Sequence, residues 1–244
     1  MLHDSLMQKV EALIRDAADE FILPRFRSLP EDAIRAKSHP NDLVTIADEE
    51  TETALRPQLE SLVPGSVVIG EEAVAENPDV LHRLNADGDF WVVDPVDGTW
   101  NFVQGNEGFA SMVAFIRKGR IIGSWILAVT EGSMAMAERG AGAEWGGASA
   151  QGLAPRVPIA EAVIDIPGPF SGSPFAGGVA AGLSAAGSSI DSRCAGWAYI
   201  RLITGETQAY LPGKMMPWDH APGVLLIEEA GGRSAFLPDA APYR

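Results

Sequence analysis

Apolar side chains recur at helical spacing near the start of the chain. The recurring positions are Leu6, Val10, Leu13, Ile14, Ala17, Ala18, Phe21 and Ile22. This spacing predicts an amphipathic helix that ends at Pro24, because proline lacks the N–H group that a helix interior requires. A second helix is predicted around Ala47, Ala54, Leu55 and Leu62, with a kink or an early stop at Pro57.

Short runs of apolar and β-branched residues predict strands in the middle of the chain. Ser66–Ile69 and Phe90–Val93 each lead directly into acidic residues. We interpret both runs as buried strands that present carboxylates at their C-terminal ends. From residue 108 to residue 137 the pattern changes to that of antiparallel strands.

The antiparallel segment contains a hairpin signal. Ala110–Arg117 and Ile121–Val129 flank Lys118-Gly119, a pair that suits a tight turn, and Ser133–Ala137 is expected to add a third strand. Residues 140–190 are rich in Gly, Ala, Pro and Ser and are expected to contain the passage to a second half of the chain.

The second half is predicted to be mainly helical. A small-residue helix is expected over Gly177–Ala186, and further helices over Trp197–Thr204 and Ala221–Ala230, the last ended by Gly231-Gly232. With neither an internal repeat nor a charged linker, the two halves are expected to pack as one unit of helices covering sheets.

Charge narrows the range of partners. The 244 residues carry 33 acidic against 18 basic side chains, a formal net charge of −15, and 46% are hydrophobic. This acidic balance argues against nucleic acid and anionic membrane as partners. A phosphorylated substrate would also be repelled unless a bound cation received it.

The compartment is predicted from cysteine usage and hydropathy. Cys194 is the only cysteine, so no internal disulfide is possible, and we interpret it as a small packed residue rather than a reactive thiol. No apolar run approaches the ~20 residues that span a bilayer. The N-terminus lacks the pattern of a signal peptide, and a cytoplasmic location is therefore expected.

Four acidic segments stand at the predicted ends of elements, and each has an ordinary structural explanation. Asp94-Pro95-Val96-Asp97-Gly98-Thr99 could be a simple turn, and Gly70-Glu71-Glu72 a solvated pair. Trp218-Asp219-His220 could hold a helix N-cap at Asp219, and Lys37–Thr45 followed by Asp48 could cap the second helix.

The combination of the four segments favours a site for a hard cation. Oxygen ligands without a His or Cys cluster suit Mg²⁺ better than zinc. Pro95 pushes Asp94 toward an extended conformation, and Gly98-Thr99 could open a helix whose N–H groups bind phosphate. His220 is expected to support the site from outside the ligand set or to lie at the surface.

In this order, the four segments resemble those of the inositol monophosphatase family of lithium-sensitive, Mg²⁺-dependent phosphatases. One family signature stands at Asp94–Thr99 and continues through Asn101-Phe102. A second stands at Trp218–Gly223 and is followed by Glu229-Ala230-Gly231-Gly232. The resemblance implies an α+β fold, an alternating α/β/α/β/α layered sandwich of the inositol monophosphatase or sugar phosphatase type.

By matching position, the resemblance also implies a ligand set. Glu71, Asp94 and the Val96 carbonyl would hold a first Mg²⁺, and Asp94, Asp97 and Asp219 a second. Glu71 would reach a third, weaker ion through water. An N-terminal half, residues 1–145, would carry the antiparallel sheet and most ligands, and residues 146–244 would supply Asp219 and the substrate contacts.

Catalytic and substrate residues follow from the same resemblance. Thr99 with Asp48, assisted by Glu71, would orient and deprotonate the attacking water. The residues expected at the phosphate and substrate are Asp97, Gly98, Thr99, Arg193, Cys194, Ala195 and Gly196. The expected reaction is hydrolysis of a small phosphate monoester by a homodimer with two or three Mg²⁺ ions. Two such ions, about 3.5–4 Å apart, can clamp the attacking and leaving oxygens.

The chain departs from the family where the alcohol is bound. Pro212 stands where a glutamate contacts inositol hydroxyls in the inositol enzymes, seven residues before Asp219. Arg193 and Lys214 are candidates to meet a polar or anionic leaving group. Histidinol phosphate, fructose bisphosphate and nucleotide 3′-phosphates are alternative substrates, although the chain shows no basic cluster for a second phosphate.

Other functions fit the residues less well. A phospho-aspartate mechanism requires Asp-x-Asp-Gly-Thr, whereas Val96 occupies the position of an acid. Asn85–Asp89 lacks the glycine position and closing glutamate of a calcium loop. A non-catalytic regulatory member of the family is a further alternative, and the complete set of acidic residues argues against it.

Overall fold

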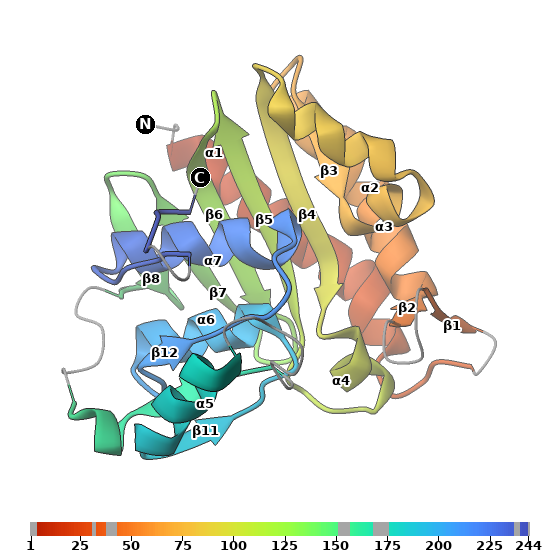
Figure 1. Cartoon of the computed structure of the whole chain (residues 1–244). Helices are drawn as coiled ribbons and strands as arrows, with labels where there is room; N and C mark the ends of the chain where they lie inside the picture. The colour runs from red at the N-terminus through yellow and green to blue at the C-terminus, as the bar shows by residue number, and fades with distance from the viewer. Residues whose placement is uncertain are drawn as a thin grey trace.

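A seven-stranded sheet runs through the centre of the computed structural model, in the order β3-β4-β5-β6-β7-β8-β9 (Figure 1). The structure describes residues 4–30, 33–37, 43–150, 157–167, 176–236 and 240–243. The strands are β3 (Val67–Gly70), β4 (Asp89–Asp97), β5 (Ala110–Arg117), β6 (Arg120–Ala128), β7 (Ser133–Glu138), β8 (Gly142–Trp145) and β9 (Ala148–Ser149). Only β3 and β4 pair in parallel, and the other neighbours are antiparallel.

The hairpin predicted at Lys118-Gly119 is confirmed. Both residues have positive φ, 50° and 69°, which matches the twist of a two-residue hairpin connection. The predicted strands before and after it are also present, and β8 and β9 extend the sheet beyond the third strand that was expected. The proposed division at residue 145 remains a prediction.

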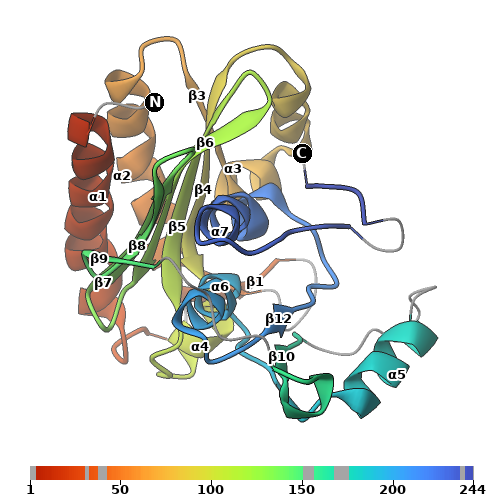
Figure 2. The same ribbon diagram turned by 90° about the vertical axis from the view of Figure 1, so that its left-hand side faces the viewer.

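Two helices cover one face of the sheet (Figure 2). The predicted opening helix is α1 (Asp4–Ala17), which continues through one π-helical turn and ends in a short 3-10 turn, Leu23–Arg25, containing Pro24. Helix α2 (Ile46–Leu62) passes through Pro57 without stopping there. Pro57 lies on the exposed side of α2, where the carbonyl that loses its partner can bond to water, while Leu55 and Leu59 anchor both sides in the core.

Helices α6 (Ala195–Thr204) and α7 (Pro217–Glu229) cover the opposite face. Beyond them lies a three-stranded sheet in the order β11-β10-β12, formed by β10 (Val163–Asp165), β11 (Ser188–Ile190) and β12 (Ala209–Tyr210). Helix α5 (Ala176–Ala185) lies outermost (Figure 2). The layers therefore alternate α/β/α/β/α, as predicted.

Short elements complete the described chain. A two-stranded ribbon, β1 (Ile34–Ala36) and β2 (Leu43–Thr45), precedes α2. Helix α3 (Glu71–Glu76) follows β3 and leads into the 3-10 helix Pro78–Asn85, and α4 (Thr99–Val103) follows β4. A further 3-10 turn, Ile159–Glu161, precedes β10. Among the described residues, no helix has the length and apolar character needed to cross a membrane.

A bulge near the end of β4 changes which face its residues occupy. Asp94 pairs with Met112 and Asp97 with Ala110, so three steps along β4 oppose two along β5. Pro95 lies inside this irregularity. Proline has no N–H group to donate to a neighbouring strand, and a bulge is a place in a sheet where this group is not needed. Val96 consequently packs with Val93 in the core cluster under α1 and α2.

The bulge brings two carboxylates to one face. In a regular strand, residues three positions apart point to opposite faces. Because of the extra residue, Asp94 and Asp97 point to the same face of the sheet. This is the face on which Val92 packs against the core that α6 and α7 share. The strand thereby delivers both acids toward the same helices.

The contact between α6 and α7 leaves no room for an added side chain at Gly223. A Cβ atom there would lie 1.9–2.2 Å from ring carbons of Tyr199. We predict that Gly223→Ala lowers the free energy of unfolding by about 1–3 kcal/mol, because the two packed helices must separate. Gly182→Ala in α5 is the control, since no atom of the described residues outside its own helix backbone lies within 4 Å of the added carbon. Thermal unfolding of both variants tests the prediction, and equal midpoints would contradict it.

Candidate active site

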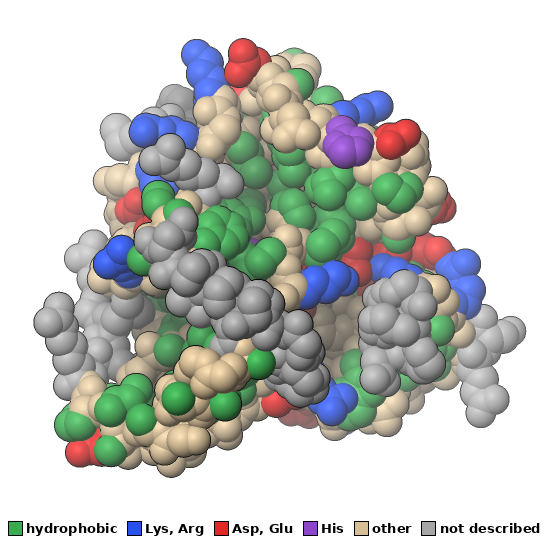
Figure 3. Space-filling view, in the orientation of Figure 1, with side chains coloured by type: hydrophobic (Ala, Val, Ile, Leu, Met, Phe, Trp, Pro, Cys, Tyr) green, Lys and Arg blue, Asp and Glu red, His purple; other side chains and the backbone are tan. Residues whose placement is uncertain are grey.

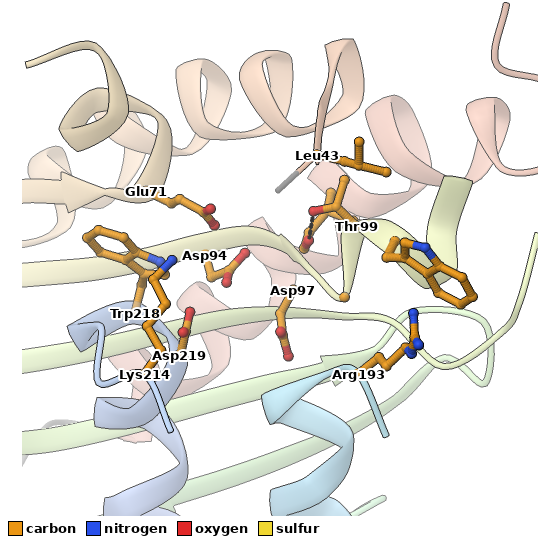
Figure 4. Close-up of a pocket in the computed structure, with 12 residues that line it drawn as sticks. Leu43, Glu71, Asp94, Asp97, Thr99, Arg193, Lys214, Trp218 and Asp219 are labelled. Carbon is orange, nitrogen blue, oxygen red and sulfur yellow. Dashed lines mark hydrogen bonds between the residues drawn. The ribbon is translucent and has the colours of Figure 1, made fainter. Parts of the chain in front are cut away.

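A pocket of about 180 Å³ opens where β4 ends, beside the starts of α3, α4 and α7 (Figure 4). Its lining consists of Leu43, Glu71, Asp94, Val96, Asp97, Gly98, Thr99, Trp100, Arg193, Lys214, Trp218 and Asp219. Segments that are far apart in the sequence therefore meet here, as predicted. Across the right-hand side of the molecule, acidic and basic side chains gather below an apolar surface (Figure 3).

Asp94 is the most confined acid of the pocket. Its side chain is 2% exposed, and among the described residues its Oδ1 atom has no hydrogen-bond partner. Burial, followed by repulsion from Glu71, Asp97 and Asp219, raises its pKa well above the ordinary value. Figure 4 shows the Asp94, Glu71 and Asp219 side chains around a common space. An orphaned buried oxygen among other acids is the feature that a bound cation would satisfy.

Asp97 is held by the N-terminus of α6. Its Oδ2 atom accepts hydrogen bonds from the Gly196 N–H at 2.6 Å and from the Cys194 thiol at 2.9 Å. Burial raises the Asp97 pKa, and these two bonds oppose the rise. The predicted segment Arg193–Gly196 thus reaches the site partly by supporting Asp97.

Cys194 is buried, which agrees with its interpretation as a packed residue. Burial and the neighbouring Asp97 raise the pKa of its thiol well above the usual range, and this disfavours a reactive thiolate.

Glu71 is paired with a lysine that the sequence interpretation did not assign to the site. Lys37 Nζ lies 2.8 Å from Glu71 Oε1 and 2.6 Å from Glu72 Oε1. Burial alone would lower the pKa of Lys37, but the two glutamates raise it overall. In the sequence, only the position of Lys37 in the segment before Asp48 pointed to the site. Its ion pair with Glu71 joins residues more than thirty positions apart, which no local pattern shows.

A further buried acid supports the start of α3. Glu52 on α2 is 2% exposed, and its carboxylate accepts hydrogen bonds from the N–H groups of Glu72 at 2.8 Å and Ala73 at 3.1 Å. A Cβ atom at Gly70 would lie 2.1–2.4 Å from this carboxylate, so only glycine fits there. Glu52 thus fixes the turn that presents Glu71 to the pocket.

Asp48 both caps α2 and contacts Thr99. Its Oδ2 atom accepts from the Thr45 hydroxyl at 2.6 Å and the Thr45 N–H at 2.9 Å, which completes the predicted capping box. Its Oδ1 atom lies 3.2 Å from the Thr99 hydroxyl, which also lies 2.9 Å from the Val96 carbonyl. Burial raises the pKa of Asp48 to about 7. Capping and a role in the site are therefore compatible.

Asp219 does not cap its helix, in contrast to one interpretation of the sequence. Helix α7 begins at Pro217 with Met216 as the preceding cap residue, so Asp219 lies within the first turn. Proline suits this first position because its missing N–H would have no partner there. Burial and repulsion from Asp97 and Glu71 raise the Asp219 pKa well above its ordinary value.

His220 is buried and lies behind the pocket. Its Nδ1 atom is 3.1 Å from the Tyr199 hydroxyl, and its Nε2 atom is 2.8 Å from the Lys214 carbonyl. Both ring nitrogens are thus engaged, which supports a positioning role and excludes the surface position that was one of the two expectations. Burial lowers the His220 pKa.

The described acidic side chains do not already enclose an ion, because no three of them converge closely enough. Two of these acids have protein partners instead, because Glu71 accepts from Lys37 and Asp97 accepts from the start of α6. The oxygen donors, the orphaned Asp94 oxygen and the mutual repulsion nevertheless fit a divalent hard cation.

Comparison with known proteins gives consistent matches. The sequence profile of the inositol monophosphatase family matches residues 4–235. The inositol-1-monophosphatase of Bacillus subtilis (strain 168) is 31% identical over 222 residues, which cover 90% of this chain and 80% of that protein. That of Mycobacterium leprae (strain TN) is 33% identical over 242 residues, covering 93% and 80%.

Solved structures show the same similarity. Inositol monophosphatase-II from Staphylococcus aureus MSSA476 superposes with a TM-score of 0.81 and 26% identity, covering 98% of this chain and 84% of that one. An IMPase/NADP phosphatase complexed with Mg²⁺ and phosphate has a TM-score of 0.78 over 97% of this chain and 87% of its own. At 21% identity, the second similarity shows the fold alone.

The raised carboxyl pKa values predict how stability depends on pH without metal. Asp48 is the reference case, with a pKa near 3.8 when exposed and about 7 when folded. Its protonated form is favoured by folding, so the stabilisation is complete below pH 3.8 and is lost as the pH rises through 7. In EDTA we expect a lower unfolding temperature at pH 8 than at pH 5.5. Added MgCl₂ should raise it more at pH 8 than KCl of equal ionic strength does; no difference between the salts would contradict this.

Glu52 provides a test of how the start of α3 is held. We predict that Glu52→Ala lowers the free energy of unfolding by about 2 kcal/mol, because two N–H groups and Arg56 lose their partner. Hydrogen exchange should show faster exchange of the Ala73 amide. Thr53→Ala, an exposed position on the same helix, is the control and should not lower stability, because alanine is the better helix former. Unaltered exchange at Ala73 would show that Glu52 does not hold this turn.

Proposed function

The chain belongs to the inositol monophosphatase family and is a phosphoric monoester hydrolase, and from this premise we propose that its pocket hydrolyses a small phosphate monoester with Mg²⁺ and water. The observation that carries the proposal is the buried, unpartnered Asp94 oxygen, placed among three further acids and beside the Thr99–Asp48 pair. The products are inorganic phosphate and an alcohol.

We assign the metal ligands by combining this geometry with the family pattern. Glu71, Asp94 and the Val96 carbonyl would hold one ion, and Asp94, Asp97 and Asp219 a second. Glu71 would reach a third ion through water. Bound Mg²⁺ would supply positive charge to the phosphate oxygens and lower the pKa of the attacking water. For Glu71 to bind an ion, its carboxylate would have to separate from Lys37. For the Val96 carbonyl to bind an ion, the Thr99 hydroxyl would have to turn from Val96 toward Asp48.

Thr99 and Asp48 are proposed to carry the proton of the attacking water. The water proton passes to Thr99 Oγ1 while the Thr99 proton moves to Asp48 Oδ1, 3.2 Å away. The Asp48 pKa of about 7 suits a group that gains and loses a proton near neutral pH. Thr45 holds the second oxygen of Asp48 and thereby keeps Oδ1 directed at Thr99. Glu71 would help to orient the same water.

The phosphoryl group is proposed to lie against the backbone of Gly98 and Thr99. Gly98 has φ of 82°, and an added Cβ would lie 2.9 Å from the Cys194 side chain and 3.2 Å from the Gly108 carbonyl. A glycine is therefore required where this backbone turns into α4. Cys194, Ala195 and Gly196 would border the substrate through their contact with Asp97.

Charge explains why substrate binding would depend on the metal. Glu71, Asp94, Asp97 and Asp219 carry a formal charge of −4 when ionised, and a phosphate dianion would be repelled. Two Mg²⁺ ions would neutralise the four acids and leave Arg193 and Lys214 as the surplus positive charge of the pocket lining, since Lys37 is also paired with Glu72. We expect little affinity for phosphate esters without metal.

The names of the relatives do not establish which alcohol this chain releases from its substrate. Pro212 has no side-chain donor or acceptor for an inositol hydroxyl, so inositol phosphate is only one candidate beside sugar, polyol, histidinol and nucleotide phosphates. A cytoplasmic location, a homodimer and inhibition by Li⁺ are proposed on the family resemblance. The complete acidic set favours an enzyme over a regulatory protein.

Asp94→Asn separates the function of the site from its stability. We expect phosphate release to fall by about 100-fold or more, since one shared ligand of both proposed ions is lost. The same change should raise the unfolding temperature of the metal-free protein at pH 8, because a neutral amide replaces a buried, unpaired charge.

The measurement is a phosphate-release screen over sugar, polyol and nucleotide monophosphates, with Mg²⁺, with EDTA, and with Mg²⁺ plus Li⁺. Asp87→Asn, in the loop before β4, is the control and should retain full activity. Release by the wild type in EDTA, or no release from any ester with Mg²⁺, would reject the proposed mechanism.

A further inference from the structure

Two basic side chains line the pocket and have positive groups available to a ligand. The Arg193 guanidinium lies over the ring of Trp100, 4.1 Å from its centroid. Its nearest acid is Asp191, whose Oδ2 atom is 3.7 Å from Nε. Within the described part of the chain, the two terminal nitrogens of Arg193 form no hydrogen bond, and the side chain is 49% exposed. The group is therefore oriented by the ring and still accessible.

Backbone contacts also fix where Arg193 stands. The residue has φ of 51°, an unusual conformation for a non-glycine residue, and its N–H donates to Asp191 Oδ1 at 2.9 Å. The next residue, Cys194, is anchored on Asp97. Since Trp100 follows Thr99 directly, both halves of the Arg193–Trp100 stack are attached to proposed catalytic or metal-binding segments.

Lys214 approaches the pocket from another loop. Its carbonyl accepts from the buried His220 side chain at 2.8 Å, and this bond ties the loop to the first turn of α7. Its ammonium group forms neither a hydrogen bond nor an ion pair with the residues that the structure describes. Its positive charge nevertheless opposes the rise in the pKa of the nearby Asp219. Lys37 differs, because it is bonded to two glutamates.

These cations suit a substrate with more than one anionic group. A planar guanidinium stacked on an aromatic ring presents a preorganised fork that matches carboxylate and phosphate geometry. On a chain with a net charge of −15, a multiply charged substrate would be repelled elsewhere. Pro212, two residues before Lys214, removes a hydroxyl contact from the same loop and leaves charge as the means of recognition.

We propose that the alcohol part of the substrate carries a second negative group, a carboxylate or a phosphate, which binds to Arg193 against Trp100, while Lys214, at the opposite end of the pocket (Figure 4), adds to the positive charge that attracts the substrate. This inference rests on the proposed function, since it names the class of phosphate monoester that the same pocket takes. The sequence shows no basic cluster for a second phosphate and offers Arg193 and Lys214 as candidates to meet a polar or anionic leaving group. The structure places both residues in the lining of one pocket, although they are separated in sequence.

The test compares esters with one carbon skeleton and different charge. The probes are glycerol 2-phosphate, glycerate 2-phosphate, in which a carboxylate replaces one hydroxymethyl group, and glycerol 1,2-bisphosphate, in which a second phosphate esterifies one hydroxymethyl group. With Mg²⁺, we expect kcat/KM of the wild type to be about 10-fold higher for at least one charged ester than for glycerol 2-phosphate. The better of the two identifies the second group as carboxylate or phosphate.

Arg193→Gln should reduce this preference, lowering kcat/KM for the charged ester about 5-fold more than for the neutral one, and Lys214→Met should reduce it by a smaller factor. Arg27→Gln is a matched control. Arg27 also has a positive φ, 60°, and lies 4.7 Å over the ring of Phe26, but it pairs with Glu107 away from the pocket lining. It should keep the full preference. Arg193→Lys, which keeps the charge without the planar fork, should give an intermediate value.

Equilibrium binding separates this proposal from the proposed function. Dissociation constants of the three probes are measured by calorimetry on Asp48→Asn with Mg²⁺. This variant is expected to block turnover, and it retains both Arg193 and Lys214. Tighter binding of a charged ester that disappears in Asp48→Asn/Arg193→Gln supports the subsite even if no ester is hydrolysed. Hydrolysis of all esters without a charge preference, or an equal loss for all esters in Arg193→Gln, would overturn the subsite and leave the phosphatase intact.

Discussion

The bulge at Pro95 is the constraint on which the site depends. A regular strand would send Asp94 and Asp97 to opposite faces of the sheet, one toward α1 and α2 and the other toward α6 and α7. The extra residue in β4 reverses the alternation, so Val96 enters the core under α1 and α2 while both acids face the opposite layer. The start of α6 can then bond Asp97, and the first turn of α7 can bring Asp219 alongside Asp94.

The gathering of these acids is electrostatically unfavourable, and the surrounding structure compensates for it unevenly. Glu71 has Lys37, Asp97 has the N–H of Gly196 and the Cys194 thiol, and Asp48 has Thr45. One oxygen of Asp94 has no partner among the described residues. Stabilising the fold and binding a cation are therefore opposed at this position, which is the pattern expected where stability is given up for function.

The same supports hold the proposed catalytic groups and the proposed selectivity groups. Arg193 precedes Cys194, which bonds Asp97, and Trp100 follows Thr99. His220 follows Asp219 and fixes the carbonyl of Lys214. With a shared scaffold of this kind, the basic residues can be replaced without changing the geometry of the acidic residues. In our proposal, the residues that carry out the reaction and those that select the alcohol are therefore neighbours on the same loops.

Local chemistry in the sequence determined the helices α1 and α2, the hairpin at Lys118-Gly119, the capping box of Thr45 and Asp48, and the acidic segments of the pocket. These features depend on periodicity and on contacts within a few residues, which a single sequence displays.

Only the tertiary structure decided that Asp97 bonds the start of α6, that Lys37 reaches Glu71 and that Glu52 holds α3, because each contact joins elements far apart in the chain. It also placed Asp219 inside its helix and brought Arg193 and Lys214 to one pocket. Packing of whole layers sets such distances, and no local pattern encodes them.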